Sequence, residues 1–224
     1  MTDDSIQTTP PTVETIDQIP TTLPILPLRD VVIYPYMIFP VLVGRESSLK
    51  AAAAAMERGK NIFLAAQKNA ALDDPGPEDV YRHGTVAKII QMLRLPNGLM
   101  KILVDGLVQA SVRSFTDRKE FLEAEIAINT TELPADKEIE ALVRHTTTLF
   151  TEYVRLNRNI PGEVLMTFEG IKEPQRKLFY IAANISQSVD VKQRVLELSR
   201  LRDQLFELSK TLTTEVEILK IERD

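Results

Sequence analysis

The chain has 224 residues, of which 44% are hydrophobic and 26% are charged, and it contains no cysteine. That length allows one large or two small globular domains, and the absence of thiols excludes a disulfide framework and a thiolate metal site. With 27 Lys and Arg against 32 Asp and Glu, the formal net charge is −5. This charge argues against a nucleic-acid-binding role, because binding to phosphates draws on a basic surface.

The first 22 residues contain seven threonines and four acidic residues, a composition that predicts a disordered leader over residues 1–22. A secretory signal would start with positive charge and continue into an apolar run, but the first basic residue is Arg29. No stretch approaches the roughly 18 uninterrupted apolar residues that a membrane span needs. We therefore expect a cytoplasmic protein without a membrane partner.

Residues 23–129 show mainly the period-two alternation of strands. The segment FLEAEIAI shows it best, since its apolar side chains share one face while Glu123 and Glu125 would face solvent. Two apolar runs flank Asn97 and Gly98, and both residues tolerate positive φ, which predicts a hairpin with a tight turn there.

One helix is expected to interrupt these strands, over residues 47–58. An alanine run favours the helix, a serine can cap its start and Gly59 can close its end. The following NIFLAA segment returns to the pattern of a strand.

After Pro134 the apolar residues recur at three- and four-residue steps, which predicts a helical domain over residues 134–224. Shorter helices are expected at about 162–169 and 174–184, and another from Asp190, where Gln193 completes a capping-box-like start. The last stripe of leucines runs to the end of the chain without Gly, Asn or Pro. We expect that this helix is truncated or that the natural chain continues.

Catalytic motifs are not found. The sequence contains neither a G-x-x-x-x-G-K-[ST] phosphate loop nor G-x-G-x-x-G. His83 and His145 lie in different halves, whereas a metal site needs three or four convergent ligands. Ser209 and Lys210 are adjacent on a predicted helix, so their side chains diverge by about 100° and cannot pair as nucleophile and base. We predict no catalytic, cofactor-binding or metal site in this chain.

The most distinctive segment is residues 23–46, LPILPLRDVVIYPYMIFPVLVGRE. Four prolines interrupt an otherwise strongly apolar run, so the segment can neither form a helix nor lie wholly inside a sheet. Some of its apolar side chains must therefore lie at edges or in loops.

Several separated motifs give the chain a family resemblance. In order they are PLRD, FPVLVGRE, AAQK, DDP, DVYRHGTVAKI, LPNG and VDGL. Residues 23–129 closely resemble the amino-terminal domain of Lon proteases, and the remainder, ending EVEILKIERD, resembles the helical part that follows in bacterial Lon. The resemblance implies an α+β fold, with a PUA-like pseudo-barrel β domain joined to a helical bundle that ends in a long helix.

The resemblance also implies a longer relative, an ATP-dependent serine protease that forms a homohexamer and degrades misfolded and short-lived regulatory proteins. In that family an AAA+ module using ATP and magnesium, and then a Ser-Lys proteolytic module, follow the helices. Neither module is present in this sequence. No catalytic or nucleotide-binding residue is carried over, and the fragment itself is expected to be inert and without a cofactor.

The expected role is the selection of unfolded or misfolded protein substrates and their degrons. A domain that holds unfolded chains needs apolar side chains on its own surface. In residues 99–105, strand parity places Leu103 on the same face as Lys101 and Asp105. The candidate substrate contacts are Leu28, Met37, Pro40 and Leu103. The alternative is that all four belong to ordinary core or edge packing.

Two other functions remain open. A free-standing interaction module or adaptor without an ATPase would use the same β domain, and the sequence beyond Asp224 would distinguish it by the presence or absence of a phosphate loop. An RNA-binding domain is suggested only by analogy with the PUA-like fold. The acidic balance opposes it, and a strongly salt-dependent affinity for RNA would be its signature.

Overall fold

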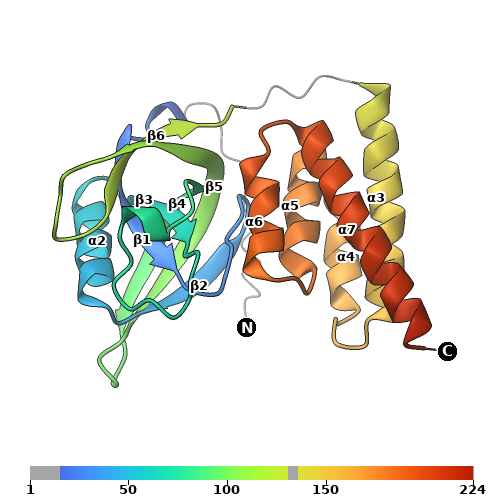
Figure 1. Ribbon diagram of the computed structural model, residues 1–224, viewed down its shortest axis with the longest axis horizontal. Coiled ribbons are helices and arrows are strands. Elements are labelled where there is room, and N and C mark those ends of the chain that lie inside the picture. Colours follow the sequence, from blue (N-terminus) through green and yellow to red (C-terminus); the bar gives the residue numbers. More distant parts are fainter. Residues whose placement is uncertain (1–15, 131–135, 224) are drawn as a thin grey trace, which may run out of the picture. The chain divides into compact units, whose positions relative to one another are not determined.

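The computed structural model describes residues 16–130 and 136–223. The chain divides into two compact units, with the boundary in the sequence between Ile128 and Asn129. The first is built mainly of strands and the second of helices (Figure 1). The fold is α+β, as the sequence predicted. In the described residues no helix is both long and apolar enough to cross a membrane. Residues 1–15 of the expected leader lie outside the described residues, and Ile19 packs into the core of the first unit.

The first unit is a six-stranded sheet in the order β2-β5-β4-β3-β1-β6. An additional pairing between β5 and β6 closes five of these strands into a barrel. β1 and β3 are parallel, and the other pairs are antiparallel. The strands are β1 (Thr22–Leu28), β2 (Ile38–Val43), β3 (Asn61–Ala66), β4 (His83–Arg94), β5 (Met100–Phe115) and β6 (Glu123–Ile128).

β5 is long and pairs with two different strands along its length. Its first part pairs with β2 and its last part with β6, and Gly106 lies where the partner changes. The amide of Tyr36 donates to Gly106 O and the amide of Gly106 donates to Met37 O, both at 2.8 Å. A Cβ atom on Gly106 would come within 2.3 Å of Tyr34 O, so glycine permits the close crossing of these two segments.

Helix α2 (Glu46–Glu57) packs its alanines against β1 and β3, which confirms the helix expected there. The expected serine cap is wrong, since the N-cap residue is Arg45 and no side chain caps the first turn. Gly59 follows the helix with a φ of +89°, and the predicted NIFLAA strand is β3. A short 3-10 turn, η1 (Pro77–Asp79), lies in the loop before β4.

The hairpin between β4 and β5 is confirmed, but its loop is longer than Asn97 and Gly98 alone. The amide of Gly98 donates to Leu95 O at 3.0 Å, and Leu95 N donates to Leu99 O at 2.8 Å. Of the two turn residues only Gly98 has a positive φ, at 84°. Asn97 instead accepts the amide hydrogen of Leu99 with its side-chain oxygen, at 3.1 Å. The turn therefore includes Pro96 and uses one left-handed residue.

The expectation that Glu123 faces solvent is wrong. Its residue is 6% exposed at the start of β6, and its carboxylate accepts hydrogen bonds from Arg58 at 2.7 Å, Thr116 at 3.2 Å and Arg118 at 3.3 Å. Burial opposes its ionisation, but these hydrogen bonds outweigh burial and lower the pKa of Glu123. Alternation located the strand correctly. Of the two arginines that bind Glu123, Arg118 lies five residues before it and Arg58 lies 65 residues before it.

The second unit contains helices at the positions that the sequence predicted. The start of the fourth differs, because the N-cap is Ser188 rather than Asp190. The helices are α3 (Lys137–Leu156), α4 (Glu163–Glu169), α5 (Pro174–Asn184), α6 (Val189–Glu197) and α7 (Leu201–Ile221).

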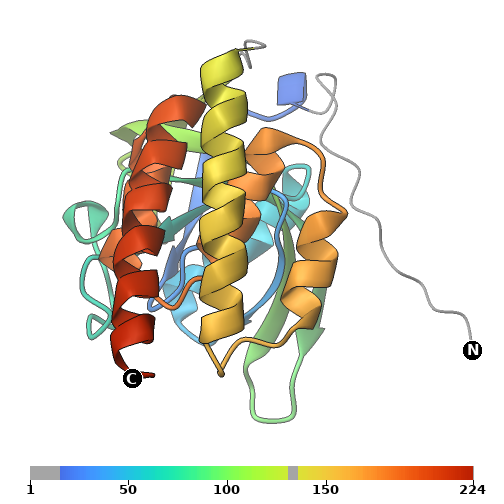
Figure 2. The same cartoon turned by 90° about the vertical axis from the view of Figure 1, so that its right-hand side faces the viewer.

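The two long helices of this unit run parallel and side by side (Figure 1 and Figure 2). Ion pairs join both ends: Glu138 to Arg202 at 2.8 Å and Glu152 to Lys220 at 2.7 Å. Between α3 and the shorter helices, the ring of Phe150 meets the edge of Phe168 at a centroid distance of 5.1 Å. The helical unit therefore has a core of its own.

Candidate substrate-binding surface

Strands β2, β5 and β4 lie side by side and present one face away from the barrel core. The register places Pro40 opposite Leu103, and Leu103 opposite Gln91. Ile102 and Val104, the neighbours of Leu103 in the chain, are fully buried on the other face. The parity expected for residues 99–105 is therefore confirmed, and it brings Pro40 and Leu103 together as direct cross-strand neighbours.

Large apolar side chains remain exposed on this outer face. Leu42 is 61% exposed, Leu93 51% and Ile90 50%. Lys101 lies between Leu42 and Leu93 in the register, where its hydrocarbon stem can extend the apolar surface. We call this group the outer patch; its members are Pro40, Leu42, Ile90, Leu93 and Leu103. A cluster of exposed apolar side chains of this kind is a candidate surface for interaction with another molecule.

An irregularity in β4 contributes to the outer patch. The pairing with β5 shifts between Ile89, which is opposite Val104, and Gln91, which is opposite Leu103. Ile90 is the extra residue of this bulge, and Ile89 keeps its place in the core at 1% exposure. A bulge re-aims side chains, and here it leaves an isoleucine exposed beside Leu103.

β2 is the edge strand of this face. In the described part of the chain β5 is its only strand partner, so the backbone groups along its other edge have no ladder to join. Pro40 sits in the middle of β2 and has no amide hydrogen, which removes one donor from that open edge. Proline at this position is a common protection of an edge against uncontrolled strand pairing.

Asp105 ends the outer face on the side away from the β4–β5 hairpin. It lies between Ile38 on β2 and Lys88 on β4. Burial raises the pKa of Asp105 above its ordinary value, because partial removal of water disfavours the charged carboxylate. The polar border of the outer patch is therefore itself partly desolvated.

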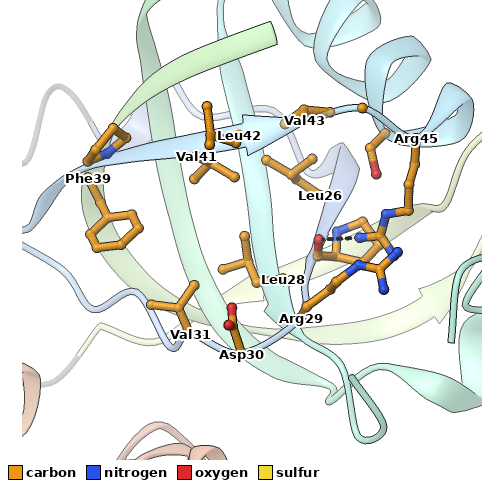
Figure 3. Close-up of a pocket in the computed structure, with 14 residues that line it drawn as sticks. Leu26, Leu28, Arg29, Asp30, Val31, Phe39, Val41, Leu42, Val43 and Arg45 are labelled. Carbon is orange, nitrogen blue, oxygen red and sulfur yellow. Dashed lines mark hydrogen bonds between the residues drawn. The ribbon is translucent and has the colours of Figure 1, made fainter. Parts of the chain in front are cut away.

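A pocket of about 450 Å³ lies on the other side of β2, between β2, the end of β1 and the start of α2 (Figure 3). Phe39 and Val41 point into it toward Leu28 and Val31, while Leu42 points away. Leu28 is 3% exposed and belongs to the barrel core. Leu28 therefore does not share the outer face with Leu103, because β1 places it on the opposite side of β2.

Met37 also differs from its expected place. It precedes β2, packs partly buried against the same core as Leu28, and accepts the amide hydrogen of Tyr34 with its Sδ atom at 3.3 Å. Of the four candidate contacts, the structure thus brings Pro40 and Leu103 together on the outer face. Leu28 and Met37 lie on the inner side, where Leu28 and Pro40 also line the pocket.

The sequence reasoning did not identify Leu42, Ile90 and Leu93. Leu42 could have been found, since it lies two residues after Pro40 and shares its face in a strand. Ile90 and Leu93 could not be assigned from alternation alone, because the bulge in β4 changes the parity along that strand.

The other polar residues that the sequence singled out belong to different elements. His83 begins β4 in the first unit, and His145 lies in α3 of the second. The hydroxyl of Ser209 donates to the carbonyl of Phe206 within α7 at 2.9 Å.

These features define a class of protein first: an α+β protein in which a closed β unit carries an exposed apolar face and a helical unit follows it. Residues 22–214 match the family of the ATP-dependent protease La (LON) substrate-binding domain. The chain belongs to this LON substrate-binding domain family.

Full-length relatives agree with this assignment. The chain is 41% identical over 201 residues to the Lon protease of Escherichia coli (strain K12), and 39% identical over 202 residues to the Lon protease of Buchnera aphidicola subsp. Acyrthosiphon pisum (strain APS). Each match covers 90% of this chain but 26% of the relative. The chain therefore spans about a quarter of the length of these curated relatives.

Solved structures support the fold. The N-terminal domain of the Mycobacterium avium complex Lon protease superposes with a TM-score of 0.68 at 22% identity, over 86% of this chain and 98% of that structure. A Lon N-terminal domain protein from Xanthomonas campestris gives 0.59 at 14% identity, over 84% of this chain and 96% of that structure.

Proposed function

We propose that this chain is the substrate-recognition and assembly region of an ATP-dependent serine protease, and that the outer patch holds exposed hydrophobic segments of unfolded proteins. The observation that carries the proposal is the exposure of Leu42 and Leu93 on either side of Lys101 on one continuous sheet face. Apolar side chains left in water at this density lower the free energy when another apolar surface covers them.

The chemistry of the outer patch suits an unfolded partner. An unfolded chain differs from a folded protein in exposing apolar side chains together with unpaired backbone amides and carbonyls. The outer patch offers an apolar surface for the side chains, and the open edge of β2 offers hydrogen-bonding groups for a backbone. We expect an apolar sheet face to select weakly among sequences, and the cost of ordering a flexible chain keeps its affinity low.

In this proposal, catalysis takes place in other modules of a longer parent protein. We assign no catalytic residue to the chain and propose that the longer parent carries an AAA+ module, with ATP and magnesium, and a Ser-Lys proteolytic module. The helical unit would connect the barrel to the ATPase module and support a homohexamer. The substrates would be misfolded proteins and short-lived regulatory proteins with degrons, in the cytoplasm.

A direct test replaces Leu103 with serine and measures binding of a fluorescently labelled, permanently unfolded protein by anisotropy. We expect Leu103→Ser to weaken binding by about threefold to tenfold, because it removes a large part of one leucine contact. The matched control is Met166→Ser, which removes a side chain of a residue 74% exposed on α4. Equal affinities for wild type and Leu103→Ser would remove the outer patch from the account.

The adaptor hypothesis uses the same outer patch but has no ATPase module in the same chain. Sequencing the gene beyond Asp224 distinguishes the two hypotheses: a phosphate loop within the following few hundred codons supports the protease, and a stop codon supports the adaptor.

A further inference from the structure

The pocket beneath β2 combines an apolar wall with a cationic end. Its wall is formed by side chains of the barrel core and of β2. Arg29 and Arg45 lie at its other end, and one carboxylate residue, Asp30, also lines the pocket (Figure 3). Its volume of about 450 Å³ is in the range of sites that bind small molecules or a few side chains. A pocket with these two ends fits a ligand that has both an apolar group and a negative charge.

The guanidinium of Arg45 is fixed by neutral partners. It donates to Pro27 O at 2.8 Å and to the side-chain oxygen of Gln67 at 2.6 Å, and among the described residues no carboxylate lies within ion-pair distance of it. Arg29, in contrast, is paired with Asp73 at 2.8 Å. Burial first, and then the nearby charge of Arg29, lower the pKa of Arg45, while the charges of Asp73 and Asp74 act in the opposite direction without outweighing them. The positive charge of Arg45 is thus held in place by neutral partners, and the two aspartates compensate it only from a distance.

Helix α2 begins at the same end of the pocket. Arg45 is its N-cap residue, and the side chain of Arg45 makes no capping hydrogen bond to the first turn. The acidic residue of that turn, Glu46, is bound to Lys50 at 2.9 Å. Uncapped amides at a helix start carry partial positive charge and favour an anion.

Ser48 provides an independent indication of a ligand. The residue lines the pocket and is 2% exposed, and its hydroxyl has no hydrogen-bond partner among residues 16–130 and 136–223. A buried hydroxyl without a partner destabilises the folded protein. Its position one turn into α2 and three residues after Arg45 makes it a ready donor to an anion at this end of the pocket.

The open edge of β2 borders the pocket. β1 and β2 both contribute lining residues, yet they are not paired with each other. An extended chain that added to this edge would direct alternate side chains into the pocket and toward the outer face. The apolar part of the pocket is therefore placed to receive a side chain from a strand lying along β2.

We propose that this pocket holds the C-terminal end of an unfolded polypeptide whose last residue is apolar. The terminal carboxylate binds Arg45, the Ser48 hydroxyl and the first amides of α2, and the last side chain fills the apolar part. The proposal rests on the proposed function in that both concern polypeptide binding. It adds a distinct site on the inner side of β2 with a defined chemical preference.

The first experiment uses the 224-residue protein and two labelled octapeptides of the same unstructured sequence ending in leucine, one with a free carboxylate and one with a C-terminal amide. We expect the free acid to bind at least about tenfold more tightly, because the amide loses the charge-assisted hydrogen bonds. Equal affinity of the two peptides would overturn the proposal. So would equally effective competition by acetate and by the unlabelled acid peptide at equal concentration.

Variants of Ser48, Ser47 and Arg45 test whether the preference for the acid peptide arises in this pocket. Ser48→Ala should reduce the acid-to-amide ratio about threefold or more and should not lower the melting temperature of the free protein, because the hydroxyl has no partner to lose. Ser47→Ala, the same change one residue earlier on α2, should leave the ratio unchanged. Arg45→Gln should remove the preference for the acid peptide, and Arg45→Lys should retain part of that preference. An acid preference that survives both Ser48→Ala and Arg45→Gln would contradict the proposal.

The outer patch and the pocket can be tested independently of each other. Leu103→Ser should leave the acid-to-amide ratio of the octapeptide unchanged, since Leu103 lies on the outer face. If Leu103→Ser does not change the affinity for the unfolded protein while the acid octapeptide still binds more tightly than the amide, the outer patch is rejected and the pocket proposal is supported. If Leu103→Ser weakens the unfolded protein but the two octapeptides bind alike, the pocket is rejected.

Discussion

The barrel unit and the helical unit leave different apolar side chains in contact with solvent. In the barrel, Leu42, Ile90 and Leu93 gather with Leu103 on one face of three neighbouring strands. In the helical unit, the exposed ones are spread along the chain, with Met166 on α4, Phe206 near the start of α7, and Ile218 and Ile221 near its end. Single exposed apolar residues are ordinary, whereas a gathered group indicates binding. We therefore place the proposed recognition surface on the barrel.

The two units also keep separate cores. The barrel core lies between its strands and α2, and the aromatic cluster of Phe150, Phe168 and Tyr180 lies within the helical unit. Damage to one core should leave the function of the other unit intact. The first change below tests this division, and the later ones test interactions within the barrel, in order of decreasing effect.

The largest effect is expected from Phe150→Ala. Phe150 is fully buried, with Phe168 at 5.1 Å and Tyr180 at 6.5 Å between ring centroids. Its removal should destabilise the helical unit by about 3–5 kcal/mol in chemical denaturation, while the barrel still binds an unfolded protein in dilute denaturant-free buffer. Loss of that binding in parallel with helical unfolding would show that the units do not act separately.

A smaller effect within the barrel is expected from Glu123→Gln. The side chain of Glu123 is 7% exposed and holds Arg58 and Arg118, so the change should cost about 2 kcal/mol at neutral pH. Because the pKa of Glu123 is lowered, its stabilisation is complete above its ordinary value of 4.5 and is lost as the pH falls through the lowered pKa. Melting curves of both proteins between pH 7 and 3 should therefore converge at the acidic end.

The neighbouring glutamate on the same strand provides the control. Glu125 is 47% exposed and meets Arg113 at 3.5 Å, so Glu125→Gln should change stability by less than about 0.5 kcal/mol. Equal losses from Glu123→Gln and Glu125→Gln would mean that the burial of Glu123 does not matter.

The smallest effect is expected from Asp105→Asn at the border of the outer patch. The pKa of Asp105 is raised by burial, so its charge disfavours folding. The penalty develops as the pH rises from the ordinary value of 3.8 to the raised pKa, and it is complete above the raised pKa. The asparagine variant should be more stable by about 0.5 kcal/mol at pH 7, since partial solvation screens the effect, and the gain should vanish below the ordinary value of 3.8. A variant less stable at pH 7 would indicate a stabilising partner for the carboxylate.

The sequence predicted the elements whose patterns are local. The period-two segment ending at Ile128, the alanine-rich helix before Gly59 and the helices after Pro134 all formed where expected. The parity around Leu103 was also right. Each of these depends on side chains a few residues apart, which is the range that alternation and helical periodicity describe.

The features that the sequence did not show arise from contacts between distant segments. The bulge at Ile90 appears only when β4 is paired with β5, and the burial of Glu123 depends on Arg58, 65 residues earlier. Leu28 was a surface candidate beside Pro40, but it is buried in the barrel core, and β1 and β2 lie around one pocket. The unpartnered hydroxyl of Ser48 likewise becomes recognisable only once α2 is packed.

The most direct test of the recognition surface is a residue-resolved amide shift map of the 224-residue protein titrated with a permanently unfolded protein. We expect shifts concentrated in β2, β4 and residues 100–105 of β5, greatly reduced in the double variant Leu93→Ser, Leu103→Ser and retained in Met166→Ser. Shifts confined to the helical unit, or a map that the double variant leaves unchanged, would contradict the assignment of the outer patch as the binding surface.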